Sequence, residues 1–219
     1  MIYNYPTLIV DSFFKDPCEV RKFALAQEFL PSPDSRFAGV RTKNLFNNYP
    51  KFFTQVCRKI LDCYSIRFIK FSATMHFHWT GKEFNSECWV HRDYNPMVLS
   101  SIIYLNETNN SIDNGTGLYK LSNLSDWDSN WEGMRNSLSK PGIKDGAAAL
   151  HNQSYSPILK IGNLFNRMVS YDASMPHTGE GYFGDTKDTG RLTLVTFFKE
   201  ITSEDNYTPL QRAETFNDL

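Results

Sequence analysis

The first part of the chain carries apolar residues at helical spacing. Asp16 can cap a helix and Pro17 suits its first turn, and the apolar stripe that follows extends to about Phe29. A second helix is predicted over residues 49–64, because its large apolar residues recur on one side. A short β-rich run over residues 7–14 precedes both. The N-terminal region is therefore predicted to supply one short strand and two helices.

After residue 65 the pattern changes from helical spacing to alternation and short apolar runs. Residues 66–79 alternate, with Phe71, Met75 and Phe77 on an apolar face. Further strands are predicted over residues 89–93, 99–105, 118–121, 158–161, 166–171 and 191–201. Two helices followed by many short strands predict an α+β chain that is mainly β. Its economical closure is a double-stranded β-helix (jelly roll) with N-terminal supporting helices.

Length and composition fit a single domain over residues 1–219. The chain of 219 residues is 41% hydrophobic and 15% aromatic, which suffices for a packed core and excludes a disordered chain. Residues from about 122 to 150 are instead rich in Ser, Asn and Asp, and we interpret them as an insertion between sheet strands. No motif in this insertion identifies a substrate.

Charge and cysteine content limit the partners and the compartment. A net charge of −1 gives no general attraction to nucleic acid or anionic lipid, and the four cysteines form no C-x-x-C pair, which is typical of free thiols in a reducing compartment. The N-terminus lacks the features of a signal peptide, and no apolar run reaches the roughly 20 residues of a membrane span. We therefore expect a soluble cytoplasmic protein with a small-molecule or peptidyl substrate, and neither nucleic acid nor membrane as a partner. The sequence leaves the oligomeric state open.

The stretch from Trp89 to Asp93 places an imidazole and a carboxylate two residues apart. On a strand, His91 and Asp93 would project from the same face. Such a pair supplies two of the three ligands in the 2-His-1-carboxylate facial triad that binds non-haem Fe(II). The pair alone is a weak signal, since a salt-bridged surface strand gives the same pattern.

Two later segments supply a second imidazole and an inward-facing cation. His177 follows the predicted strand 166–171 and is flanked by a proline and a nearby glycine, which can fix its direction. Arg191 and Thr193 share one face of the last predicted strand, whose alternate positions are apolar. An arginine that faces into a sheet is costly unless it meets an anion. A guanidinium with a hydroxyl two residues away therefore predicts a carboxylate clamp.

The order H-x-D, distant His, R-x-T resembles that of the Fe(II)/2-oxoglutarate-dependent oxygenases, most closely the prolyl-4-hydroxylase-like group. The resemblance spans roughly residues 7–200 and includes the run Ser101 to Asn106 and the turn Gly115 to Leu118. Thr116 departs from the glycine pair that this turn has in the group. Arg191 is a second departure, because many members carry lysine there, whereas other branches of the superfamily use arginine with Ser or Thr two residues on.

The resemblance implies a role for each of these residues. The implied metal ligands, which form the catalytic centre, are His91, Asp93 and His177. The implied co-substrate is 2-oxoglutarate, with its distal carboxylate held by Arg191 and assisted by Thr193. Tyr104 on a neighbouring strand would be a second contact to 2-oxoglutarate, unless it packs in the core. The implied reaction uses O₂ to hydroxylate an amino-acid side chain such as prolyl, or a small metabolite, and releases succinate and CO₂.

Two alternatives stay open at this point. A cupin-like binding protein would keep the jelly roll without turnover, although an intact triad and an inward Arg191 speak against it. An oxidative nucleic-acid demethylase of the same superfamily is disfavoured by the near-neutral net charge and by the lack of a basic stripe interleaved with aromatic residues.

Overall fold

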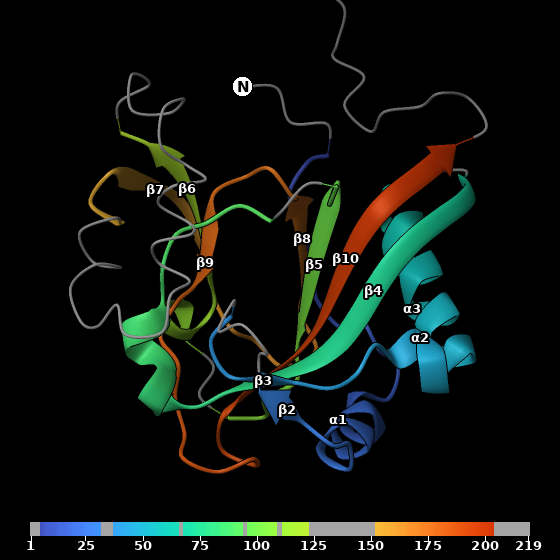
Figure 1. Ribbon diagram of the computed structural model, residues 1–219, viewed down its shortest axis with the longest axis horizontal. Coiled ribbons are helices and arrows are strands. Elements are labelled where there is room, and N and C mark those ends of the chain that lie inside the picture. The colour runs from blue at the N-terminus through green and yellow to red at the C-terminus, as the bar shows by residue number, and fades with distance from the viewer. Residues whose placement is uncertain are drawn as a thin grey trace, which may run out of the picture.

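Helices from the N-terminal region cover the outer face of a large antiparallel sheet (Figure 1). The computed structural model describes residues 5–31, 37–65, 68–93, 96–108, 111–122 and 152–203. The helices in these ranges are α1 (Pro17–Leu25), α2 (Leu45–Asn48) and α3 (Pro50–Cys63). The Asp16 side chain caps α1 by accepting a hydrogen bond of 3.2 Å from the Glu19 amide, and a proline begins both α1 and α3.

The described strands form two antiparallel sheets. The larger has seven strands in the order β1-β8-β5-β10-β4-β3-β2, and the smaller has three in the order β7-β6-β9. The strands of the larger sheet are β1 (Leu8–Val10), β2 (Leu30–Pro31), β3 (Val40–Arg41), β4 (Phe68–Thr80), β5 (Leu99–Tyr104), β8 (Met168–Asp172) and β10 (Arg191–Ser203). Those of the smaller sheet are β6 (Thr116–Leu121), β7 (Tyr155–Ile161) and β9 (His177–Gly179). Short 3₁₀ helices, η1 (Lys82–Glu87) and η2 (Ile112–Asn114), lie between strands.

The largest apolar core lies between the helices and the outer face of the larger sheet. Side chains of α3 such as Val56 and Ile60 pack there with Phe77 of β4 and Leu194 of β10, all at most 4% exposed. The inner face of the same sheet carries different chemistry. Strand alternation sends Leu192 and Leu194 outward to the helices and their neighbours inward, so a single strand serves both the core and the interior between the sheets.

Strand β10 holds the central position on which the interior depends. It pairs with β4 along one edge and with β5 along the other, and the three strands run side by side in Figure 1. In this register Thr193 lies opposite both His78 of β4 and Tyr104 of β5. Residues near the start of β10 are thus held from both sides, which fixes the direction of inward side chains at this end of the sheet.

Most predicted elements are present, with some changes. The first helix ends at Leu25 rather than near Phe29, and the predicted strand over residues 89–93 is wrong: it is an irregular segment with one isolated bridge at His91. The predicted strand over residues 7–14 shortens to three residues. The predicted insertion at 122–150 falls, apart from residue 122, outside the described residues. The four cysteines all lie in the described ranges, and no disulfide joins them, which agrees with the expected reduced thiols. No helix in the described ranges is both long and apolar enough to cross a membrane.

Candidate metal centre and adjoining pocket

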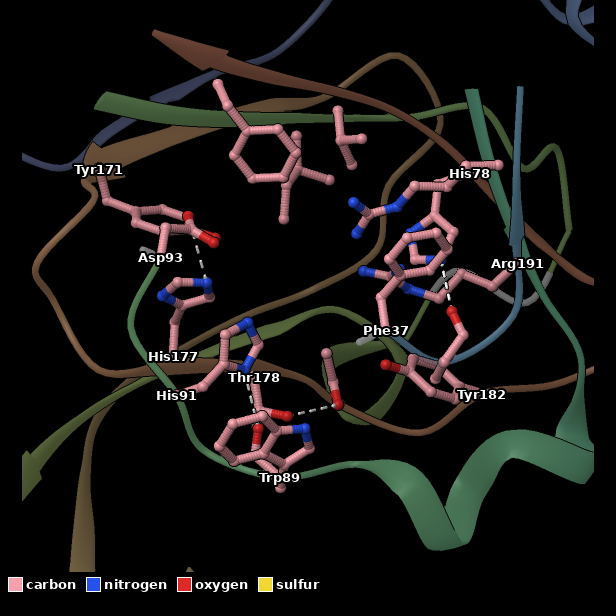
Figure 2. A pocket seen from close by; sticks show the side chains of 16 residues that line it. Phe37, His78, Trp89, His91, Asp93, Tyr171, His177, Thr178, Tyr182 and Arg191 are labelled. Atoms are coloured by element: carbon pink, nitrogen blue, oxygen red, sulfur yellow. Dashed lines mark hydrogen bonds and ion pairs between the residues drawn. The ribbon is translucent and has the colours of Figure 1, made fainter. Parts of the chain in front are cut away.

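A pocket opens between the inner face of the larger sheet and strand β9 of the smaller one. Its volume is about 680 Å³, counted to its open mouth, and β3, β4, β5, β8 and β10 supply one wall. Strand β9 and the segment around His91 supply the other wall. Figure 2 shows His91, Asp93 and His177 on one side of this space, with His78 and Arg191 on the opposite side. The pocket therefore contains two separate polar groups that face a shared interior.

His91, Asp93 and His177 form the first of these groups. One ligand atom from each residue lies within 4.8 Å of those of the other two. The backbone creates this arrangement without a strand at 89–93, because His91 and His177 exchange two backbone hydrogen bonds of 2.9 and 2.7 Å. The Asp93 amide donates a hydrogen bond of 3.0 Å to the Ala173 carbonyl, which fixes the backbone from which the carboxylate extends. Two imidazoles and one carboxylate are a donor set suited to Fe(II).

Both imidazoles are oriented by the same kind of hydrogen bond. Nδ1 of His91 lies 3.0 Å from the carbonyl oxygen of Trp89, and Nδ1 of His177 lies 2.8 Å from that of Met175. A carbonyl only accepts, so each Nδ1 carries the hydrogen and each Nε2 keeps its lone pair. This is the tautomer that a metal requires of an imidazole ligand bound through Nε2.

The surroundings of the two rings keep His91 neutral. Burial, with the neighbouring His177, lowers the pKa of His91 to about 4, against a weaker opposing effect of Asp93. The two rings are tilted by 54° with centroids 4.5 Å apart, and the Tyr171 ring lies 4.7 Å from that of His177. A neutral imidazole at physiological pH needs no deprotonation before it binds a metal.

The Asp93 carboxylate is held by a hydroxyl from the larger sheet. Ser100, an inward residue of β5, donates a short hydrogen bond to Oδ2 of Asp93, and the same oxygen lies 3.6 Å from Nε2 of His177. Among the described residues Oδ1 has no hydrogen-bond donor of its own. Ser100 thus fixes the carboxylate while leaving one oxygen for a metal ion.

Replacing Ser100 by alanine is expected to weaken metal binding by about tenfold without unfolding the protein, since outer-shell partners of metal ligands typically contribute 10- to 100-fold. Mn(II) affinity measured by calorimetry checks this. The matched control is Ser101→Ala on the next residue, because the Ser101 hydroxyl is buried with no partner among the described residues. Equal Mn(II) affinity in the Ser100 and Ser101 variants would show that the hydroxyl does not support the carboxylate.

Arg191 forms the second polar group. It is the first residue of β10 and only 4% exposed. Its Nε and Nη2 donate long hydrogen bonds of 3.4 and 3.3 Å to the carbonyls of Asn114 and Gly115. Within the described part of the chain, no carboxylate lies within ion-pair distance of this guanidinium. A buried cation without a carboxylate partner is suited to an anionic ligand that enters the pocket.

Tyr104 and Thr193 lie next to Arg191 rather than on the pocket wall. The Arg191 guanidinium sits over the Tyr104 ring at 5.5 Å, and the Tyr104 hydroxyl pairs with that of Thr116 at 2.6 Å. Thr193 lies inward between Arg191 and Val195, and its hydroxyl donates to the His78 carbonyl at 3.4 Å. Tyr104 therefore supports the guanidinium, whereas the Thr193 hydroxyl bonds to the backbone of β4. A direct contact of either residue with a ligand stays a prediction.

Most of the chain matches a known family model. Residues 3–198 match the model of a family of unknown function, DUF6445. The chain belongs to this family. A search of curated proteins found no match to the sequence.

Solved structures share the fold of this DUF6445 protein. HygX from Streptomyces hygroscopicus, with nickel and 2-oxoglutarate bound, matches with a TM-score of 0.53 and 12% identity, over 96% of this chain and 88% of HygX. EvdO2 from Micromonospora carbonacea var. aurantiaca, complexed with 2-oxoglutarate, matches with a TM-score of 0.51 and 11% identity, over 91% and 89%. A prolyl-4-hydroxylase from Pseudomonas putida matches with a TM-score of 0.45 and 14% identity, over 88% and 91%. The resemblance to Fe(II)/2-oxoglutarate oxygenases is thus confirmed at the level of the fold.

The pocket of the DUF6445 protein also contains residues that sequence reasoning missed. Arg41 of β3 and Phe37 line it, although they precede the first predicted site residue by about fifty positions. Tyr182 lines it from the loop after β9. Phe197 also lines the pocket, whereas its neighbour Phe198 lies in the core. In the sequence, the available signal for this part of the pocket is Arg41 four residues after Phe37. No spacing rule connects such a pair with a binding site.

Proposed function

We propose that this protein is a Fe(II)- and 2-oxoglutarate-dependent dioxygenase with a double-stranded β-helix fold. The observation that carries the proposal is the convergence of His91, Asp93 and His177, each with its free donor atom directed into one pocket, opposite a buried Arg191. The likeness in fold to structures that contain 2-oxoglutarate supports the proposal. The proposed outcome is hydroxylation of a substrate C–H bond, with release of succinate and CO₂.

Each residue has a defined task in this proposal. His91, Asp93 and His177 would hold Fe(II) through two imidazoles and one carboxylate. Arg191 would bind the distal carboxylate of 2-oxoglutarate, with Tyr104 keeping the guanidinium in place and Thr193 assisting from the same face of β10. When bound, the iron and 2-oxoglutarate would supply the oxidising power for O₂-dependent hydroxylation.

The proposal is tested by anaerobic addition of Fe(II) and 2-oxoglutarate. A weak visible charge-transfer band should appear with the native protein and should be absent from the His91→Ala variant. Succinate release in air gives a second measurement on the same samples. A native protein that gives neither the band nor succinate would contradict the assignment and would favour a binding protein without turnover.

A further inference from the structure

A second guanidinium lines the pocket, at a different position from Arg191. Arg41 extends from the two-residue strand β3, which pairs with β4 so that Arg41 lies opposite His78. Its guanidinium carbon sits 3.8 Å over the Phe37 ring and 5.5 Å from the Phe197 ring. These two rings pack against the side chain, and all three residues line the pocket.

No described residue neutralises this cation. Nε of Arg41 is buried without a hydrogen-bond partner among the described residues, which also offer its side chain no carboxylate within ion-pair distance. Burial lowers the pKa of Arg41 to about 10, so it stays charged at neutral pH. A desolvated charge with an unused donor is costly in the free protein, and the cost is recovered when an anion binds.

Arg41 shares its pocket with the candidate metal centre. His91, Asp93 and His177 line the same pocket as Arg41, and no ion pair joins Asp93 to Arg41. An anion bound at Arg41 would therefore share this space with the metal, as a substrate that is to be oxidised must.

The sum of the formal charges in the loaded pocket leaves room for one more anion. Under the proposed function, the metal contributes two positive charges and Arg41 and Arg191 one each. Asp93 and the dianion of 2-oxoglutarate contribute three negative charges. A histidine that binds a metal does so as a neutral imidazole, and burial lowers the pKa of His78, so the histidines add none. The loaded pocket then keeps one uncompensated positive charge among its described residues. One carboxylate of 2-oxoglutarate goes to the metal and the other to Arg191, so neither is available to Arg41.

We infer that Arg41 is a substrate-binding residue that pairs with a carboxylate, and that the substrate is a small free acid such as an amino acid or an organic acid. This inference rests on the proposed function. The planar edge of a guanidinium between two aromatic rings matches a carboxylate in the same plane. A neutral residue within a polypeptide, such as prolyl, has no carboxylate and would leave Arg41 unpaired, so the inference disfavours such residues and favours small free acids.

The test measures binding rather than turnover. The full chain is loaded with Zn(II) and 2-oxoglutarate, and saturation-transfer NMR screens the free amino acids, small mono- and dicarboxylic acids, the C-terminal amides of the amino acids, and inorganic phosphate. We expect at least one acid to bind and its amide to bind at least about tenfold more weakly, the cost of losing a charge-assisted bidentate pair.

Variants then assign the effect to Arg41. Arg41→Ala should weaken binding of the acid at least about tenfold and Arg41→Lys less, because lysine keeps the charge but loses the fork. Both should bind 2-oxoglutarate within about twofold of the native protein. Lys43→Ala, an exposed cation two residues away, is the matched control and should change nothing. Melting temperatures establish that each variant is folded.

Several outcomes would overturn the inference. They are binding of no acid, equal binding of acids and amides, preference for phosphate over every carboxylate, or unchanged acid binding in Arg41→Ala. A tenfold loss of 2-oxoglutarate affinity in Arg41→Ala would instead assign Arg41 to the co-substrate. Failure of the proposed function is separate, because it appears in the native protein as absence of metal-dependent 2-oxoglutarate binding before any variant is compared.

Discussion

Replacement of His177 by alanine is expected to abolish Fe(II) binding in the pocket. His177 is 5% exposed, and its ring lies between His91 and Tyr171, where no other described side chain could substitute as a ligand. Loss of outer-shell partners alone typically costs 10- to 100-fold in metal affinity, so loss of a ligand should cost at least about 100-fold. Anaerobic Fe(II) titration against a chelator measures the affinity.

Two further variants separate metal binding from folding. His177→Gln keeps much of the side-chain volume between the neighbouring rings while removing the imidazole, so it should bind Fe(II) as poorly as alanine with a smaller loss of stability. His76→Gln is the matched control, because His76 hydrogen-bonds the Thr42 carbonyl outside the metal centre. Native-like Fe(II) affinity in a folded His177 variant would remove this residue from the ligand set.

Replacement of Arg191 by alanine is expected to weaken 2-oxoglutarate binding while leaving the free protein as stable as before, or more stable. The guanidinium is buried, and its hydrogen bonds to described residues are two long ones to carbonyls, so the free protein bears much of its desolvation cost. Loss of one partner of a buried charge pair typically costs 2 to 5 kcal/mol, which corresponds to at least about 30-fold in affinity. Calorimetry with Mn(II) present measures 2-oxoglutarate binding, and urea denaturation measures stability.

Weaker 2-oxoglutarate binding combined with unchanged or higher stability would distinguish a ligand-binding role of Arg191 from a structural one. A residue that only supported the fold would lose stability and binding together. Arg191→Lys should retain part of the affinity, and Arg58→Ala, an exposed arginine on α3, should retain all of it. Truncation before Arg191 is a poorer experiment, because it removes β10 from between β4 and β5 and would destroy the larger sheet. An Arg191→Ala variant with native 2-oxoglutarate affinity would contradict the assigned role.

Local signals in the sequence explain which elements were predicted well. The cap at Asp16 and the apolar stripe of α3 are determined within one or two turns of helix, and alternation along β4 and β10 is determined by strand geometry. The strand predicted around His91 is absent because this segment makes a single bridge, to His177, which is far away in the sequence. Two residues at positions i and i+2 still converge there, since the backbone bonds to His177 and Ala173 impose the direction.

The sequence by itself determined the order of the chemistry: H-x-D, a distant histidine, and arginine with threonine on the last strand. Only the tertiary structure decided that Tyr104 supports Arg191 from outside the pocket wall, that Thr193 bonds to the backbone of β4, that Ser100 holds Asp93, and that Arg41 lines the same pocket. The reason is physical. Spacing along one strand sets which face a side chain occupies, whereas its partners come from strands that are neighbours only after the sheets have formed.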